Sequence, residues 1–527
     1  MANMVNQFSQ VPTVDVPRNV FERNHTWKGT IDSGYLYPVF FDEVLPGDTK
    51  KLITTFFGRL STPFVPVMDN IYLDYHLFFV PNRLVWDNWQ KFMGERKNPS
   101  DSIDYLNPVV NSGADGFKRG GFFDYLSIPP AIKNLSVDAK YARAYNLIWN
   151  EWYRDENLQD SVEVPLGDGP DSEATYPLLK RGKRQDYFTS ALPQPQKGPG
   201  VELPLGTTAP VKSNGKAIRF SRVGDGNWSE LFGKEYNGAG SFCGVNTNSN
   251  GVGIGKALAF TSTGAEQTGL YADLSSATAA TINSLRQAIA LQQFLEQDMR
   301  GGTRYVELIL SHFGVRCPDY RLQRPEYLGG STTRINVSPI AQTSSTDTTS
   351  PQGNLAAIGT VASSNSGFTH SFTEHGIILG LVSIRADLTY QQGVDRHFLR
   401  QTRYDYFFPT LAHLSEQGIY NQEIYAQGND KDKEIFGYQE RNGEYRYKNS
   451  YITGKFRSSD PQSLDIWHLA QNFGSLPTLS SEFIEENPPL KRVLAVQNEP
   501  ELLLDVFHNF DDIRPIPQYG IPGLRRV

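Results

Sequence analysis

The sequence predicts a mainly β protein in which long loop insertions and a few helices interrupt the strands. Two segments indicate strands most directly. In Ile71–Val80 every second side chain is apolar or aromatic, which is the two-residue period of a strand with one buried face. Gly376–Leu388 is a nearly continuous apolar run, as in a strand that is buried on both faces. Glycine, proline and long polar stretches separate the strands and predict loops.

Three strands are predicted in the N-terminal part. Tyr35–Phe41 is the first, and the turn residues Pro46-Gly47-Asp48 follow it. Lys51–Leu60 and Ile71–Val80 come next. The face of Ile71–Val80 that is expected to meet the core carries Ile71, Leu73, Tyr75, Leu77 and Phe79.

Three helices are predicted. One covers 84–93 and ends at Gly94, and a second covers about 138–157. The third covers 282–300, because apolar residues recur at three- and four-residue steps before the two glycines that begin at Gly301. The second helix has a stripe that either packs in the core or meets a neighbouring molecule: Tyr141, Tyr145, Ile148 and Trp152.

Four stretches have compositions that are poor in core residues. Residues 160–215 form a proline-rich connector, and 224–281 are rich in Gly, Asn, Ser, Thr and Ala. The Ser/Thr-rich stretch 331–372 is expected to be an exposed connection. In 419–456 tyrosines alternate with charged residues, which indicates either an interface or tyrosine-rich edge strands.

The composition of the 527 residues limits the class of protein. With 31 Phe and 26 Tyr, the chain can bury a sizeable core and leave apolar surface for neighbours. Two cysteines, Cys243 and Cys317, are too few for a disulfide framework and suggest a reducing cytoplasm. No apolar run approaches the roughly twenty residues that span a bilayer, and the N-terminus lacks the layout of a signal peptide.

The net charge of −7 limits how strongly the chain alone can bind nucleic acid. A protein whose only task is to coat nucleic acid carries a basic excess, since its affinity comes from the release of phosphate counterions. If this chain encloses DNA, much of the neutralising charge must come from another molecule.

Some segments are similar to catalytic motifs but lack the residues or the spacing that those motifs require. Gly251–Lys256 is similar to a phosphate loop, but Asn250 stands in place of the first glycine and Ala257 in place of Ser or Thr. The histidines of HSFTEH (370–375) do not have the spacing of a zinc protease. Carboxylates are plentiful, so a glycosidase pair stays open, although nothing marks one. An enzyme is not expected.

Arginines and aromatic rings are threaded together between residues 300 and 327. Large permanent interfaces favour both, because each buries much surface and still satisfies directional partners. A solvated basic segment beside a core helix is the alternative. The predicted interface residues are Arg300, Arg304, Tyr305, Arg316, Tyr320, Arg321, Arg324 and Tyr327.

Nine short segments occur in a fixed order along most of the chain, except for about 200–280. They are Trp27–Thr30, Pro46–Asp48, Asp74–Arg83, Arg300–Glu307, His312–Val315, Asp319–Gly330, Glu374–Gly376, Val382–Asp387 and Tyr390–Gly393. In sequence and order these segments resemble the major capsid proteins of the Microviridae, the small single-stranded-DNA bacteriophages, and within them the gokushovirus branch.

This resemblance implies an eight-stranded antiparallel jelly roll of viral capsid type with long insertions. Sixty copies would form a T=1 icosahedral shell around circular single-stranded DNA, assembled in the host bacterial cytoplasm. The core would comprise 1–195 and 282–527. Residues 196–281 would be a variable surface protrusion at the threefold axis with host-contact candidates Asn237, Phe242, Asn246, Asn248 and Asn250. A lectin-like, carbohydrate-binding jelly-roll virion protein is the alternative.

The resemblance also implies partners. These are a small basic DNA-binding virion protein, a pilot or minor virion protein, a host surface receptor and a scaffolding protein. No cofactor is expected, and a structural divalent cation such as calcium between subunits stays open. The candidates for contact with the packaged DNA are Lys180, Arg181, Lys183, Arg184, Arg514, Tyr519, Arg525 and Arg526.

Overall fold

Eight strand positions form two antiparallel sheets. They are β1 (Asn19–Glu22) with its continuation β2 (His25–Ile31), β3 (Tyr37–Val44), β4 (Thr49–Leu60), β5 (Ile71–Pro81), β14 (Glu326–Ala341), β15 (Leu355–Ser371), β16 (Gly376–Ala386) and β21 (Leu502–Arg514). β1 and β2 pair with consecutive parts of β21, so the two segments occupy one strand position.

The order of the strands is that of a jelly roll. The first sheet runs β1/β2–β21–β4–β15, and the second runs β3–β16–β5–β14. The last part of β14 also pairs with β15 and joins the two sheets along one edge. Numbered by position along the chain, the sheets read 1-8-3-6 and 2-7-4-5, which is two Greek keys folded together. The predicted eight-stranded antiparallel jelly roll is confirmed.

The structure is a computed structural model that describes residues 17–201, 282–301, 305–314, 323–343, 355–412 and 416–519, with positions 346, 352, 353 and 414 and short strands inside 202–281. The chain divides into two compact units. The first comprises Met1–Pro195 with Gly301–Val527, and the second comprises Gln196–Arg300.

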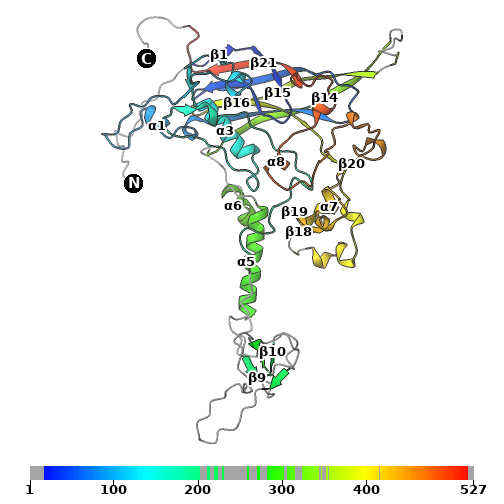
Figure 1. The fold of residues 1–527 in the computed structure, drawn as a ribbon. Helices are drawn as coiled ribbons and strands as arrows, with labels where there is room; N and C mark the ends of the chain where they lie inside the picture. The colour runs from blue at the N-terminus through cyan, green and yellow to red at the C-terminus, as the bar shows by residue number, and fades with distance from the viewer. Residues whose placement is uncertain are drawn as a thin grey trace. The chain divides into compact units, whose positions relative to one another are not determined.

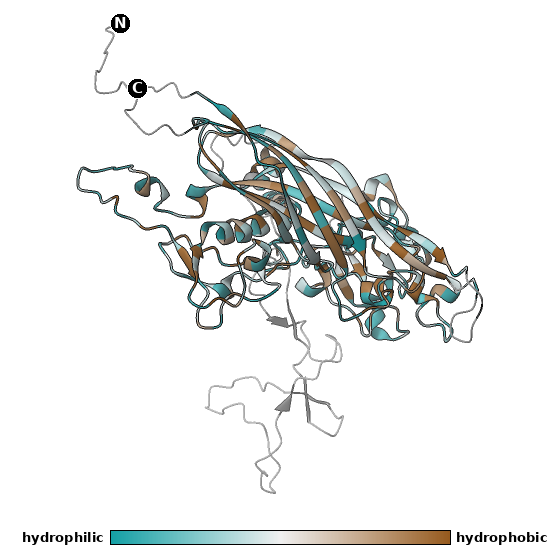
Figure 2. Ribbon diagram, turned by 90° about the horizontal axis from the view of Figure 1, so that it is seen from above, coloured by the Kyte–Doolittle hydropathy of each residue, from teal (hydrophilic) through white to brown (hydrophobic). Residues whose placement is uncertain are grey.

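The main core lies between the two sheets. Alternate residues of each strand point into it, such as Leu52 and Phe56 of β4 and Leu504 and Val506 of β21. Figure 2 shows the resulting alternation of hydrophobic and hydrophilic residues along the strands. The predicted core face of β5 is confirmed, because its five side chains at 71, 73, 75, 77 and 79 belong to this core.

A second layer of packing covers the other face of the second sheet. α2 (Phe122–Tyr125) and α3 (Lys140–Ile148), which continues as a π-helical turn at Trp149–Tyr153, pack with Phe78 of β5 and Leu379 of β16. Figure 1 shows α3 against the sandwich. This layer explains why every residue of β16 is buried, as the continuous apolar run predicted.

Two predicted helices are shorter in the structure. The segment 84–93 forms only a 3-10 turn at Asn82–Leu84 and α1 (Trp89–Phe92) before Gly94, whose φ is +102°. Between them Trp86 is buried and its indole donates to Asp168 Oδ1 at 2.8 Å, so tertiary packing overrides the helical pattern. The helix predicted over 138–157 ends at Tyr153.

The prediction of an exposed connection over 331–372 is wrong for the residues described. β14 and β15 are the two longest strands of the sandwich, and β15 pairs with β4 along nearly its whole length. Threonine and serine in these strands occupy mainly the solvent face while Val361 and Phe368 enter the core. Only one face of each strand carries apolar side chains. In a segment with so many serines and threonines, this alternation is too weak to predict a strand from the sequence.

The remaining elements of the first unit are short. They are β6 (Val109–Asn111), β7 (Ser136–Asp138), β8 (Asp171–Ser172), α6 (Tyr305–Phe313), β17 (Thr389–Tyr390), β18 (Gln417–Tyr420), α7 (Asn421–Ile424), β19 (Ile435–Gln439), β20 (Ser450–Tyr451), α8 (Ser481–Ile484) and several 3-10 turns. A third apolar cluster, which includes Phe188, Ile419 and Phe436, holds the long excursion between β16 and β21 together.

The second unit contains the predicted helix and several short strands. α5 spans Ile282–Arg300 and ends directly before Gly301, as predicted. The strands are β9 (Val211–Ser213), β10 (Arg219–Arg222), β11 (Trp228–Glu230), β12 (Leu258–Ala259) and β13 (Leu270–Ala272). β10 pairs with β11 and β12, and β9 pairs with β13. None of the helices in the described residues could cross a membrane.

Candidate assembly and DNA-facing surfaces

An exposed arginine–aromatic cluster forms where the π-helical turn after α3 meets the start of β14. The indole of Trp152 donates to the carbonyl oxygen of Pro325 at 3.0 Å. The Arg324 guanidinium lies 5.3 Å from the centre of the Trp152 ring, and the Tyr327 ring lies 5.9 Å from it. The structure therefore brings two predicted interface residues, Arg324 and Tyr327, together on a tryptophan that is itself 40% exposed.

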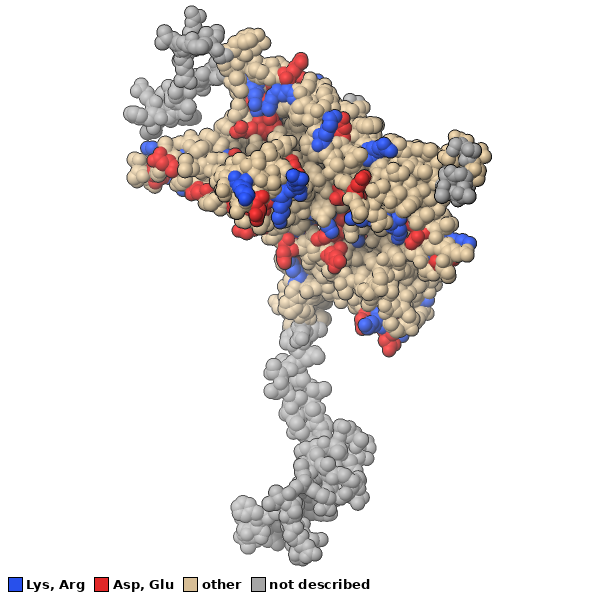
Figure 3. Space-filling view, turned by 45° about the horizontal axis from the view of Figure 1, so that its top comes forward, with Lys and Arg blue, Asp and Glu red and all other residues tan. Residues whose placement is uncertain are grey.

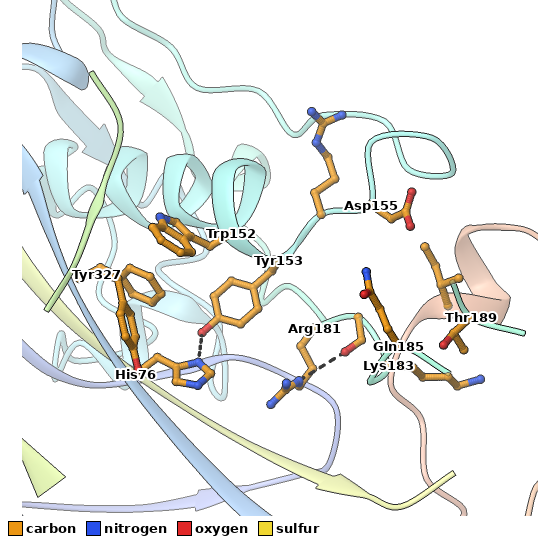
Figure 4. Close-up of a pocket in the computed structure, with 13 residues that line it drawn as sticks. His76, Trp152, Tyr153, Asp155, Arg181, Lys183, Gln185, Thr189 and Tyr327 are labelled. Atoms are coloured by element: carbon orange, nitrogen blue, oxygen red, sulfur yellow. Dashed lines mark hydrogen bonds between the residues drawn. The ribbon is translucent and has the colours of Figure 1, made fainter. Parts of the chain in front are cut away.

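A cavity of about 440 Å³ opens beside this cluster and is called the Trp152 pocket below. Figure 4 shows aromatic side chains on one side of it and basic and polar side chains on the other. The lining residues are His76, Phe78, Trp152, Tyr153, Arg154, Asp155, Arg181, Gly182, Lys183, Gln185, Thr189, Tyr327 and Ile484.

The aromatic side of the pocket is held by hydrogen bonds between neutral groups. His76 Nδ1 lies 2.8 Å from the Tyr153 hydroxyl (Figure 4). Burial, together with the nearby Arg181 cation, lowers the pKa of His76 to about 4. Burial also raises the pKa of Tyr153. At neutral pH both side chains are therefore uncharged, and they fix the position of the rings around them.

The basic side of the pocket includes two predicted DNA-facing residues that the fold already uses. Arg181 Nη1 lies 2.6 Å from Asp74 Oδ2, which Arg385 Nε also approaches to 2.7 Å. Lys183 Nζ donates to the Phe483 carbonyl oxygen at 2.6 Å, and burial lowers the pKa of this lysine. Both cations are therefore held by contacts within the chain, and both residues also line the pocket.

The other DNA-facing candidates are scattered. Lys180 lies 3.5 Å from Glu485, while Arg184 and Tyr519 are exposed. On the face shown in Figure 3, basic and acidic side chains are interspersed. Arg525 and Arg526 lie outside the described residues.

Arg514 belongs to a buried charge cluster that links the two sheets. Its Nε lies 3.0 Å from Asp48 and 2.7 Å from Asp512. Lys50, which is fully buried, reaches Asp512 at 2.9 Å and Asp42 of β3 at 2.5 Å. The charge cluster consists of Arg23, Asp42, Asp48, Lys50, Asp512 and Arg514. A structural role therefore accounts for Arg514, and DNA contact by it stays a prediction.

The remaining sequence-based candidates are placed only in part. Arg300 is the exposed last residue of α5, and Tyr305 begins α6 with its side chain outside the described part of the chain. The other interface candidates outside the described residues are Arg304, Arg316, Tyr320 and Arg321. The host-contact candidates Asn237, Phe242, Asn246, Asn248 and Asn250 are outside them too.

A larger exposed aromatic surface lies in residues 396–451, called the aromatic excursion below. Its exposed rings are Phe398, Tyr404, Tyr406, Phe407, Phe408, Tyr420, Tyr445, Tyr447 and Tyr451. Arg400 lies between two of them, 4.9 Å from the centre of the Tyr406 ring and 4.7 Å from that of Tyr445. The tyrosines of 419–456 belong to the predicted interface or edge strands, whereas the rings of 398–408 are not predicted, although their density in the sequence is a usable signal.

The residues that the structure describes contain no cluster of three or more His, Cys, Asp or Glu side chains arranged to hold a metal ion. The acidic groups of the charge cluster are occupied by lysine and arginine instead.

The fold and these surfaces define a class before any comparison. Antiparallel jelly rolls with this connectivity are typical of viral shell proteins and of lectins. Exposed arginine–aromatic surfaces of this extent are typical of proteins that bind other macromolecules.

Similarity to known proteins distinguishes between a viral shell protein and a lectin. A sequence model of the capsid protein (F protein) family matches residues 9–524. The capsid protein VP1 of Bdellovibrio phage phiMH2K is 49% identical over 98% of this chain and 97% of its own length. The proteins of the same name from Chlamydia phage 1 and Spiroplasma virus 4 are 43% and 37% identical, each over 99% of this chain and 98% of its own length.

The chain therefore belongs to the bacteriophage capsid protein family, and the resemblance to Microviridae capsid proteins is confirmed. Its role is structural, as a component of the virion.

Proposed function

We propose that sixty copies of this chain form a small T=1 icosahedral shell around circular single-stranded DNA. The observation that carries this proposal is a jelly roll with a large exposed aromatic excursion. Exposed rings in this number are costly to leave in water, and obligate interfaces between subunits bury more than about 2,000 Å² of surface in total. Repeated copies of one chain can cover such a surface through symmetric contacts.

Because the chain is acidic, another molecule must neutralise much of the charge of the packaged DNA. With a net charge of −7, the shell cannot neutralise the phosphates of the DNA alone. A small basic DNA-binding virion protein is the proposed source of the missing positive charge. A pilot or minor virion protein and a scaffolding protein are further proposed partners, with assembly in the bacterial cytoplasm.

Residues 196–281 are the proposed variable protrusion at the threefold axis, with a host surface receptor as its partner. All of them fall within the second compact unit, Gln196–Arg300. A lectin-like role is the alternative, and sugar-dependent binding by the isolated soluble chain would favour it. No catalytic step is part of the proposal, since shell geometry and interface energy suffice for the function.

The test is to express the chain with its neighbouring phage genes in a bacterium and to image the purified particles by electron microscopy. Icosahedral shells of sixty copies, built chiefly from this chain, are the expected result. Soluble monomers or small oligomers under every condition, including the presence of the other virion proteins, would contradict the shell.

A further inference from the structure

We propose that the Trp152 pocket binds one unpaired base of single-stranded nucleic acid together with its phosphate. This inference rests on the proposed function, because the single-stranded DNA that the proposed shell encloses is the nucleic acid available to this chain.

Trp152 and Tyr327 form a stacking surface whose position is fixed. Trp152 is held by its hydrogen bond to Pro325 and by the rings of Phe78 and Tyr327, whose centres lie 5.6 and 5.9 Å away. Trp152 and Tyr327 nevertheless remain 40% and 44% exposed. Aromatic side chains held in place beside cations are what proteins use to bind single strands without reading their sequence.

The lining of the pocket carries more cationic than anionic side chains. Three cationic side chains, Arg154, Arg181 and Lys183, line the pocket against one carboxylate, Asp155. Behind the lining, Arg181 and Arg385 share Asp74, and Lys183 lies near Glu486, Asp186 and Glu485. The cationic excess is therefore confined to the lining itself, where a phosphate could accept hydrogen bonds from it.

The Arg154 guanidinium supplies a hydrogen-bond donor group on the lining of the pocket. Arg154 Nη1 donates to the Gln159 carbonyl oxygen at 3.1 Å. Its Nε is buried and has no hydrogen-bond partner among the described residues. Because protein atoms enclose this nitrogen, a phosphate in the pocket would meet the rest of the guanidinium, which belongs to a residue of the lining.

The size of the pocket limits the ligand. About 440 Å³ is within the range of sites for small ligands and suits one splayed nucleotide. A stacked duplex does not present a base to a pocket, whereas an unpaired strand does.

Photo-crosslinking of the unmodified full-length chain tests the site without any risk to folding. A short oligothymidylate that carries 5-iodouracil is irradiated with the chain, and the adduct is located by mass spectrometry. Adducts at Trp152 or Tyr327 are expected. Adducts confined to other peptides, or none, would overturn the proposal.

Variants measure the contribution of each part through the anisotropy of a labelled oligothymidylate. Trp152→Ala should bind about tenfold more weakly, the loss expected for one stacked base. Arg154→Gln should weaken binding and reduce the slope of log affinity against log salt by about 0.7, because one phosphate contact is lost. Cooperative unfolding of each variant is checked first, and the crosslink decides alone if one fails to fold.

Two matched controls remove the same groups elsewhere. Tyr404→Ala removes an exposed ring and Arg403→Gln removes an exposed guanidinium, and neither residue lines the pocket. Both should bind as the unmodified chain does. Losses equal to those of the pocket variants would overturn the proposal, as would Trp152-dependent binding of oligolysine in place of the oligonucleotide.

The same variants separate this inference from the shell. Shells of normal size that hold DNA less firmly in Trp152→Ala would support both proposals. Failure of the unmodified chain to form shells, with the crosslink at Trp152 intact, would remove the shell and leave the pocket.

Discussion

At the scale of single residues, the charge cluster shows how this chain buries ions. Lys50 has no exposed surface and is surrounded by Asp42, Asp48 and Asp512. Burying an ion is costly unless partners with good geometry compensate for the lost water. The cluster therefore specifies how β3, β4 and β21 meet, because any shift of one strand would separate the charges.

Lys50→Met should lower the free energy of unfolding by about 3–5 kcal/mol, because it leaves buried carboxylates without their main cation. Lys28→Met is the matched control, since Lys28 pairs with Asp505 at 2.8 Å on the surface. This control should cost less than about 1 kcal/mol. Urea unfolding of the soluble chain measures both, and equal losses would contradict the structural role of the cluster.

Glu486 should make stability depend on pH. Burial raises its pKa from 4.5 to about 7 in spite of Arg181 and Lys183. Because the folded state holds this proton more tightly than the unfolded state, the free energy of unfolding falls as pH rises through this range. The full penalty, up to about 3 kcal/mol, is present above the folded pKa.

Glu486→Gln lacks this titration, so its stability relative to the unmodified chain should rise between pH 5 and pH 8. His76 and His508, whose pKa values are lowered to about 4, oppose the trend but are common to both proteins and cancel. Denaturant unfolding of both proteins at the two pH values measures the difference. A difference that does not change with pH would contradict the role of Glu486.

Residue roles were the least predictable part of the site. The sequence showed that Arg181 and Arg514 are basic, but not that Asp74 and Asp48 lie beside them, since those partners are far away along the chain. Only tertiary structure separates a basic residue that closes an ion pair from one that faces a ligand.

At the scale of the elements, burial distinguishes β16 from β21. Ile378 of β16 faces the core between the sheets, and its neighbour Leu379 faces the α3 layer. In β21, by contrast, Leu504 is buried and its neighbour Leu503 is half exposed.

Leu379→Ala and Ile378→Ala should each cost about 2–5 kcal/mol of unfolding free energy. Leu504→Ala should cost a similar amount, whereas Leu503→Ala should stay within about 0.5 kcal/mol. Thermal and urea unfolding of the four variants provide the measurement. A small effect of Leu379→Ala would show that the helical layer does not seal this face.

The elements were predictable where apolar periodicity was strong. The sequence predicts the strands at Ile71–Val80 and Gly376–Leu388 because whole faces of them are apolar, and it predicts α5 because its period is helical and glycine follows it. It does not predict β14 and β15, because pairing with β4 and β5, far away in sequence, stabilises strands whose own composition favours loops.

At the scale of the whole molecule, the division into two units predicts independent folding of the jelly roll. Deletion of residues 227–277, which lie within the second unit, should leave the cooperative unfolding of the first unit unchanged. Circular dichroism during urea unfolding measures this. Loss of all cooperative unfolding would show that the segment belongs to the core.

The aromatic excursion should contribute to shell assembly more than to folding. Phe398 and Phe407 are 83% and 49% exposed, so replacing both by serine should change the free energy of unfolding by less than about 1 kcal/mol. In an assembled shell the same rings would be buried against a second copy, and their loss should reduce the yield of shells several-fold. The matched control, Phe398→Leu with Phe407→Tyr, retains most of the apolar area and should assemble normally. Shell yield by sedimentation, measured beside subunit stability, separates the two effects. Normal yield from the serine variant would place the subunit contacts elsewhere, because rings that form a contact between copies cannot be removed without weakening it.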